Sequence, residues 1–153
     1  MNTEKHVYVL GKYFGESEIT ELLSELDVQE KPKLKRGDDT TFLSKPTKGI
    51  ELTFEDSEAL ITSAREYPEG ALVLSNIRFY GVKTDEFSLF QDKLPFNVNF
   101  GDDKNTLISK LGQPVLSNPS GTKMRWDSQA VSMFASLNQS GHLEIFSIQL
   151  LAG

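Results

Sequence analysis

Two short segments of the chain repeat apolar residues at helical spacing. Between residues 18 and 26 the apolar residues stand at positions 19, 22, 23 and 26, and between residues 104 and 111 they stand at 107, 108 and 111. Residues three and four positions apart lie on the same face of an α-helix. Each segment therefore predicts an amphipathic helix with one buried face.

Polar and helix-breaking residues bound both predicted helices. Ser17 precedes the first segment and is its expected N-cap, because a hydroxyl there can accept a hydrogen bond from a backbone N–H of the first turn. Asp102 or Asp103 has the same place before the second segment, and Gly112 and Pro114 follow that segment. Glycine just after the last turn, with proline close behind, is a typical helix end.

Alternating apolar and polar residues predict strands in both halves of the chain. Residues 50–54 match residues 131–135, and residues 72–80 match residues 143–151, with apolar side chains at corresponding positions. A period of two residues is typical of a strand that buries one face. Four strands of this kind are expected, two in each half.

The predicted elements follow the same order in both halves. A strand around Phe42 corresponds to one around Met124, so each half contains a helix followed by three strands. We interpret this order as a duplicated helix-plus-three-strand unit, with repeats at about 7–81 and 94–151 in a single domain. Chance recurrence of short apolar runs is the alternative explanation. The duplication predicts an α+β fold, with helices packed on one face of an antiparallel sheet.

The connection between the second and third predicted strands is longer in the first half. Residues 138–141, Asn-Gln-Ser-Gly, predict a tight turn, whereas residues 55–70 predict a long loop or a short helix. Arg65 is the one basic residue of this insertion, and we expect the insertion to project away from the framework of the two repeats. Its acidic residues are Glu55, Asp56, Glu58, Glu66 and Glu69.

Residues 81–99 join the two halves. They contain Phe87, Leu89, Phe90 and Leu94, which is too many large apolar side chains for a flexible linker. We expect an ordered connection there, with room for a further strand.

The charge of the chain bears on its partners. The 22 acidic and 16 basic residues give a formal net charge of −6. Such a surface repels nucleic-acid phosphates and anionic lipid, and it attracts a basic protein. Keeping a small domain soluble is the other explanation of a moderate negative charge. We expect neither nucleic acid nor membrane as a partner.

The cysteine count and the first residues bear on the compartment. The chain has no cysteine, which excludes disulfides and thiolate metal sites. The first residues, Met-Asn-Thr-Glu-Lys-His, lack the basic and long apolar regions of a secretory signal. We therefore expect a cytoplasmic protein.

A search for reactive groups finds no recognisable catalytic site. His6 and His142 have no partners at metal-ligand spacing, and the two Asp-Asp pairs do not follow the calcium-loop pattern. Neither a phosphate-binding glycine loop nor a G-x-S-x-G motif is present. A carboxylate pair for glycoside chemistry stays open, because sequence does not fix the separation of two acids. We expect a protein that is not an enzyme and that has no cofactor and no metal.

The outward face of the predicted strands mixes arginine, aromatic and acidic residues. Such a mixture resembles a protein-recognition surface, where aromatic and arginine anchors dominate the binding energy. An ordinary solvated sheet face is the alternative. We assign Val73, Ser75, Ile77, Phe79, Phe146, Ile148 and Leu150 to the core, and Glu51, Thr53, Glu55, Asn76, Arg78, Tyr80, Ser132, Phe134, Ser136, Ser147 and Gln149 to the outward face.

Residues 94–114 carry a resemblance to known proteins. The segment LPFNVNFGDDKNTLISKLGQP combines an apolar strand, a Gly-Asp helix start, an amphipathic helix and a Leu-Gly-x-Pro end. Similar segments occur in the outer-membrane lipoprotein BamE and in β-lactamase inhibitory protein, whose fold is a tandem repeat of helix-and-sheet units. Together with residues 49–54 and 74–80, the chain most resembles predicted immunity proteins of bacterial toxin systems, over about residues 40–150. It lacks the lipid-bearing cysteine of BamE.

The resemblance implies a protein that binds a cognate toxin and occludes its active site or substrate path. Toxins that cut nucleic acid tend to be basic around the active site, so an acidic insertion would steer the two proteins together. The alternatives are a small ligand-binding or enzymatic α+β domain and an envelope-assembly scaffold of the BamE type. The expected partner-binding residues are Glu55, Asp56, Glu58, Glu66 and Glu69 for steering, and Tyr67, Arg78, Tyr80 and Phe134 for anchoring.

Overall fold

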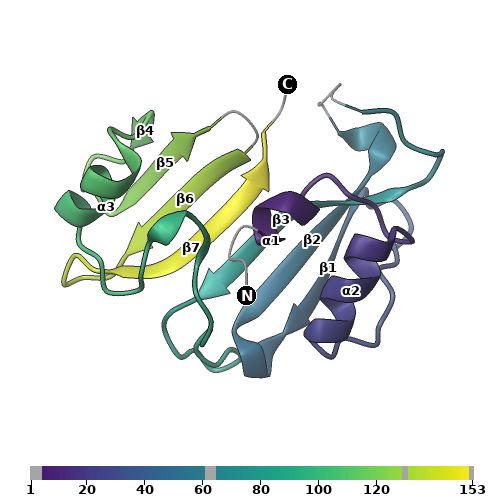
Figure 1. Cartoon of the computed structure of the whole chain (residues 1–153), viewed down its shortest axis with the longest axis horizontal. Coiled ribbons are helices and arrows are strands. Elements are labelled where there is room, and N and C mark those ends of the chain that lie inside the picture. Colours follow the sequence, from purple (N-terminus) through teal and green to yellow (C-terminus); the bar gives the residue numbers. More distant parts are fainter. Residues whose placement is uncertain (1–4, 61–64, 129–130, 152–153) are drawn as a thin grey trace.

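A computed structural model describes residues 5–60, 65–128 and 131–151 of the chain (Figure 1). The α-helices are α1 (Lys5–Val9), α2 (Ser17–Glu25) and α3 (Lys104–Leu111), and the 3-10 helices are η1 (Pro46–Lys48), η2 (Ser57–Ala59) and η3 (Pro95–Asn97). The strands are β1 (Thr40–Lys45), β2 (Ile50–Asp56), β3 (Leu72–Tyr80), β4 (Leu116–Ser117), β5 (Lys123–Asp127), β6 (Val131–Leu137) and β7 (Leu143–Leu150). No helix in the described part of the chain is long and apolar enough to cross a bilayer.

The strands form one sheet of seven, in the order β1-β2-β3-β7-β6-β5-β4, and every neighbouring pair is antiparallel. The predicted α+β class and antiparallel sheet are therefore confirmed. The last strand of each half, β3 and β7, pair with each other at the centre of the sheet. Residues far apart in the sequence thus share one continuous surface, as Figure 1 shows.

In each of the longer strands, most of the apolar residues that alternate with polar ones are buried. Ile50, Leu52 and Phe54 of β2 are fully buried, and the residues between them are half-buried. One irregularity interrupts this pattern, because the register between β2 and β3 shifts at Thr53 and Phe54. A β-bulge of this kind places two residues of one strand opposite one residue of the other.

The helices bury one face each, and their ends differ from one another. Ile19, Leu22 and Leu23 of α2 belong to the same buried cluster as the inner residues of β2. The N-cap of α2 is Glu16, whose side chain makes no capping hydrogen bond, so the expectation that Ser17 caps the helix was wrong. The side chain of Asp103 caps α3 by accepting the backbone N–H of Thr106 at 2.8 Å, as predicted.

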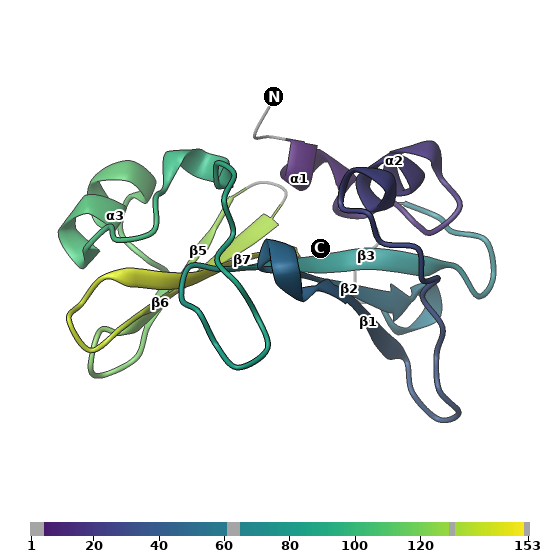
Figure 2. The ribbon, with the colours of Figure 1, turned by 90° about the horizontal axis from the view of Figure 1, so that it is seen from below.

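Figure 2 shows α1, α2 and α3 on the same side of the sheet ribbon. The opposite side of the sheet is where the outward residues of the strands emerge. Leu107 of α3 and Ile19 of α2 are both completely buried and lie in one apolar cluster with residues of β2, β3, β6 and β7. The two halves therefore share a core.

The connection between the halves, residues 81–99, is ordered, and it contains η3 and no strand. Phe87, Phe90 and Leu94 are buried, and Leu89 is exposed. The connection passes so close to the start of β2 that a Cβ atom on Gly49 would lie 2.5 Å from the backbone nitrogen of Phe90. Gly49 also has a positive φ of 65°, which glycine adopts without steric cost.

Candidate functional site

The register of the antiparallel pairs arranges the outward side chains in rows across the sheet. One row follows the pairings from Glu51 to Arg78, then to Ser147, Phe134 and Arg125. This row crosses β2, β3, β7, β6 and β5, so it runs from the first half into the second. Directly opposite residues in adjacent strands have neighbouring side chains. The face away from the helices therefore carries one continuous strip of side chains.

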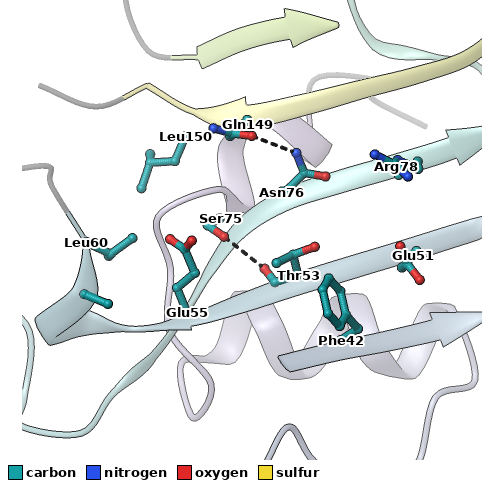
Figure 3. A pocket seen from close by; sticks show the side chains of 11 residues that line it. Phe42, Glu51, Thr53, Glu55, Leu60, Ser75, Asn76, Arg78, Gln149 and Leu150 are labelled. Atoms are coloured by element: carbon teal, nitrogen blue, oxygen red, sulfur yellow. Dashed lines mark hydrogen bonds between the residues drawn. The ribbon is translucent and has the colours of Figure 1, made fainter. Parts of the chain in front are cut away.

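A first hollow of about 560 Å³ lies over β1, β2 and β3 (Figure 3). The β-bulge contributes to it, since Ser75 and Asn76 both line the hollow. The Ser75 hydroxyl donates to the Thr53 carbonyl at 3.4 Å, as Figure 3 shows. Ser75 is buried, as expected, but it faces this hollow instead of the helix-covered core. The lining residues are Phe42, Glu51, Thr53, Glu55, Ala59, Leu60, Ser75, Asn76, Arg78, Gln149 and Leu150.

Two carboxylates give the first hollow a negative charge. Burial raises the pKa of Glu51, with attraction to Arg78 opposing the shift and Glu86 adding to it. Burial also raises the pKa of Glu55, with Asp39 adding to the shift and the polar Ser75 hydroxyl opposing it. Neither carboxylate forms an ion pair within the described ranges. Both stay half-buried without a cation in contact, which is unfavourable unless a ligand supplies one.

A second hollow of about 290 Å³ lies over β3, β7, β6 and β5. It shares Asn76, Arg78 and Gln149 with the first hollow, so the two adjoin. The Asn76 amide donates to the Gln149 side-chain oxygen at 3.3 Å across β3 and β7 (Figure 3). The other lining residues are Lys123, Met124, Phe134, Ala135, Ser136, Ile145 and Ser147.

Phe134 stands beside a pre-arranged charged group. The Arg125 guanidinium lies 5.6 Å from the centre of the Phe134 ring. Its Nε donates to Asp127 Oδ1 at 2.9 Å, and Ser132 donates to the same oxygen at 2.7 Å. The Ser132 hydroxyl and the Arg125 hydrogen bond lower the pKa of Asp127. Arg125 is therefore held in place by its own strand and the next one.

The five acidic residues predicted to steer a partner do not form one cluster. Glu55 lies in β2 and lines the first hollow, while Asp56 accepts the backbone N–H of Glu58 at 3.0 Å and caps η2. Glu58, Glu66 and Glu69 are exposed. Residues 61–64 of the same insertion lie outside the described residues.

The insertion is held against the N-terminal segment. The Tyr67 hydroxyl donates to the Gly11 carbonyl at 2.6 Å, and burial raises the Tyr67 pKa. Arg65 pairs with Glu16, and its guanidinium lies 5.2 and 5.0 Å from the ring centres of Tyr13 and Tyr67. The expectation that the insertion projects away from the framework of the repeats was therefore wrong for Arg65 and Tyr67. Tyr67 is half-buried and engaged within the fold.

Tyr80 is the clearest correction among the predicted anchors. Its alternation places it outward, yet only 9% of it is exposed, because its ring stacks on Phe87 with centroids 4.1 Å apart. The connection between the halves covers this end of β3. Tyr80 is thus a packing residue in the folded chain.

Arg78 and Phe134 are the two predicted residues that the structure brings to one hollow, and Glu55 shares the other hollow with Arg78. Phe42 and Lys123 were not predicted at this surface. Phe42 is 58% exposed on edge strand β1, and Lys123 is exposed on β5. A sequence signal for both residues does exist. Pairing the three predicted strands of each half in antiparallel register, residue by residue, would have placed Phe42 and Lys123 on this surface.

Within residues 5–60, 65–128 and 131–151, no group of three side chains is arranged to hold a metal ion. Comparison of the chain with protein-family models, with curated proteins and with solved structures finds no significant match. The face of the sheet away from the helices, which carries both hollows, is called the outer sheet face below.

Proposed function

We propose that this protein is an immunity protein that binds a cognate bacterial toxin and neutralises it by occluding its active site. In this proposal the outer sheet face is the docking surface, and the protein acts as a stoichiometric inhibitor in the cytoplasm. The observation that carries the proposal is the pair of adjoining hollows on the face away from the helices, joined by Asn76, Arg78 and Gln149.

The side chains on this face are of the kinds that anchor interfaces. Phe42 is exposed, Phe134 is half-exposed, and Arg78 is exposed without an ion pair in the described part of the chain. Aromatic and arginine residues supply most of the binding energy in protein interfaces. Two hollows separated by such side chains fit a protruding loop or helix of a partner better than a single small molecule.

The acidic residues support a basic partner, such as a nuclease domain. Glu51 and Glu55 lie in the first hollow without cations in contact. Three further acids are exposed in the segment that follows β2: Glu58, Glu66 and Glu69. A negative surface speeds the approach of a positive one, and it competes with phosphate at a nucleic-acid site. We assign steering to the exposed acids and direct contact to the two acids of the hollow.

We also infer that the chain arose by duplication of a helix-plus-three-strand unit whose helices pack on one face. The support is that β2 and β6 coincide with the matched segments 50–54 and 131–135, and that β3 and β7 coincide with 72–80 and 143–151. The second half adds the two-residue strand β4, which has no counterpart in the described part of the first half. A duplication would explain why equivalent strands meet at the centre of the sheet.

A ligand-binding domain is the second candidate, and the size of the first hollow favours it. Small-molecule sites occupy roughly 300–1,000 Å³, and this hollow measures about 560 Å³. A small cationic ligand would satisfy Glu51 and Glu55. Saturation of the hollow by such a ligand, without any protein partner, would favour this candidate.

Co-purification from the native host tests the proposal. The full chain, carrying a terminal tag, should recover a toxic protein in a one-to-one complex, and its expression should rescue cells from that toxin. An Arg78→Ala/Phe134→Ala double variant should lose rescue while remaining folded. Failure to recover a toxic partner, or full rescue by the double variant, would contradict the proposal.

The steering role needs a separate measurement. Reversal of three exposed acids, Glu58→Lys/Glu66→Lys/Glu69→Lys, should slow association with the toxin about ten-fold at low salt and leave dissociation unchanged. A matched reversal elsewhere, at exposed Glu21, Glu30 and Asp92, should slow association less. Equal effects of the two reversals would show that net charge alone, and not the insertion, steers the partner.

A further inference from the structure

Arg78 lies between the two hollows and is free to bind an anion. It is exposed on β3, it lines both hollows, and it makes no hydrogen bond or ion pair within the described ranges. Its neighbour on β2 is Glu51, whose carboxylate lies beyond ion-pair distance; burial raises the pKa of Glu51, and attraction to Arg78 opposes that rise. A guanidinium has five N–H donors and binds a carboxylate through two parallel hydrogen bonds. The donors of Arg78 are all available.

Ser147 is the neighbour of Arg78 on the other side. It pairs with Arg78 across β3 and β7, only 6% of it is exposed, and it lines the second hollow. Its hydroxyl has no hydrogen-bond partner among the residues that the structure describes. The residue lines the hollow, so its hydroxyl can donate a hydrogen bond to an acceptor placed there.

The remaining charge of the second hollow is positive. Lys123 is exposed at its rim without an ion pair in the described part of the chain, and no aspartate or glutamate lines it. Asn76 and Gln149 already bind each other. The hollow therefore offers a guanidinium, an ammonium and a hydroxyl to a ligand that can accept hydrogen bonds. The first hollow is the opposite, since Glu51 and Glu55 line it.

We propose that the second hollow holds an aspartate or glutamate side chain of the protein partner, with its carboxylate between Arg78 and Ser147. This inference rests on the proposed function, because it takes the outer sheet face as the docking surface. In this arrangement a basic partner places a basic residue in the first hollow, against Glu51 and Glu55, and an acidic residue in the second hollow beside it. The order of these two charges would then set the register of docking and select the cognate partner.

A library of random linear peptides displayed on phage is the probe, selected against the immobilised full chain. Enriched peptides should share an acidic residue at one position. A synthetic copy should bind about ten-fold more weakly when that residue is changed to its amide, because a hydrogen bond between charged groups is lost. Arg78→Gln and Ser147→Ala should each weaken the acidic peptide and leave the amide peptide unchanged.

Control variants separate a lost contact from a lost fold. Arg36→Gln removes an exposed arginine that lines neither hollow, and Ser147→Thr keeps the hydroxyl, so both should bind the acidic peptide as the wild type does. Thermal unfolding of every variant should match the wild type.

Three outcomes would overturn the assignment. In the first, the selected peptides share no acidic position. In the second, the acidic peptide binds the Arg78→Gln variant as tightly as the wild type. In the third, inorganic phosphate displaces the peptide at concentrations where acetate has no effect. The last would identify the occupant as a phosphate group. The peptide result does not depend on any toxin, so loss of toxin neutralisation with intact peptide binding would count against the proposed function alone.

Discussion

The two halves of the molecule differ most in how their second and third strands are connected. In the second half, the Asn138 carbonyl accepts the Gly141 N–H at 2.9 Å, and its side chain accepts the N–H groups of Ser140 and His142. In the first half, Arg65 and Tyr67 bind residues 11–16. The short turn satisfies its own polar groups, whereas the long connection depends on a segment distant in sequence. Local and long-range interactions thus do the same task in the two halves.

The outer faces of the halves differ in charge. The hollow over β1–β3 is lined by Glu51 and Glu55, and the hollow that extends over β7–β5 is lined by Lys123. Arg78 belongs to both. The two halves of one sheet therefore carry opposite charges on a shared surface, and in the proposed function this difference would favour one orientation of the partner.

The largest expected effect comes from the seam between the halves. Phe146 of β7 is completely buried and pairs with Phe79 of β3. Phe146→Ala should lower the free energy of unfolding by about 3–5 kcal/mol, because it leaves a cavity in the shared core. Urea unfolding followed by circular dichroism and by the fluorescence of Trp126 should still give one coincident transition.

Phe42→Ala is the control for this prediction, because Phe42 is 58% exposed on an edge strand. Its cost should stay within about 0.5 kcal/mol. Two separate transitions in the Phe146 variant would show that the halves are independent folding units that merely touch.

A second contrast concerns the ends of α2 and α3. Buried Trp126 donates its indole N–H to the Gly112 carbonyl at 2.7 Å, whereas the exposed Lys48 ammonium donates to the Glu25 carbonyl at 3.0 Å. Trp126→Phe should cost about 1–3 kcal/mol, since the variant loses this hydrogen bond and replaces a buried indole with a smaller ring. Lys48→Met should cost within about 0.5 kcal/mol, since water replaces the ammonium. Equal costs in chemical denaturation would remove this difference between the halves.

Sequence periodicity predicted the strands of both halves, because burial of one face demands a period of two over a whole strand. The turn at Asn138 and the cap at Asp103 were also predictable, since their hydrogen bonds stay within a few residues. Arg78 and Phe134 were found by the same alternation.

Long-range contacts account for what the sequence did not predict. The β-bulge opposite Thr53 turns Ser75 toward the first hollow, and no local pattern marks that register shift. Tyr80 is buried because Phe87, from the connection, stacks on it. The sequence alone indicates only that Ser147 is an outward serine. Its position beside Arg78 follows from the pairing of β3 with β7.

The anchoring of the long connection should show a smaller effect. Tyr67→Phe removes the donor to the Gly11 carbonyl and should cost about 0.5–1.5 kcal/mol. Hydrogen exchange at the amide of Ala71, which donates to the Pro68 carbonyl at 3.1 Å, should accelerate. Tyr8→Phe, at a tyrosine that is 62% exposed, should change neither quantity. Unaltered exchange in the Tyr67 variant would mean that Arg65 alone holds the connection.

The smallest effect is a pH dependence that distinguishes the carboxylates of the first hollow from the helix cap in the second half. Burial raises the folded-state pKa of Glu51 and Glu55 above the ordinary value of 4.5. The stability that these groups contribute is therefore complete below that value and is lost as the pH rises through the folded-state pKa. The free energy of unfolding of the wild type, relative to Glu51→Gln/Glu55→Gln, should decline with rising pH across that interval.

Asp103 should behave in the opposite way. The backbone N–H of Thr106 holds its pKa below the ordinary value of 3.8, so its contribution is present above that value and is lost as the pH falls through the folded-state pKa. Relative to Asp103→Asn, the wild type should therefore gain stability as the pH rises from acid. Denaturant titrations at matched pH measure both slopes. Slopes of the same sign would show that Glu51 and Glu55 already have cationic partners in the free protein, and the first hollow would then have no unmet charge to offer a ligand.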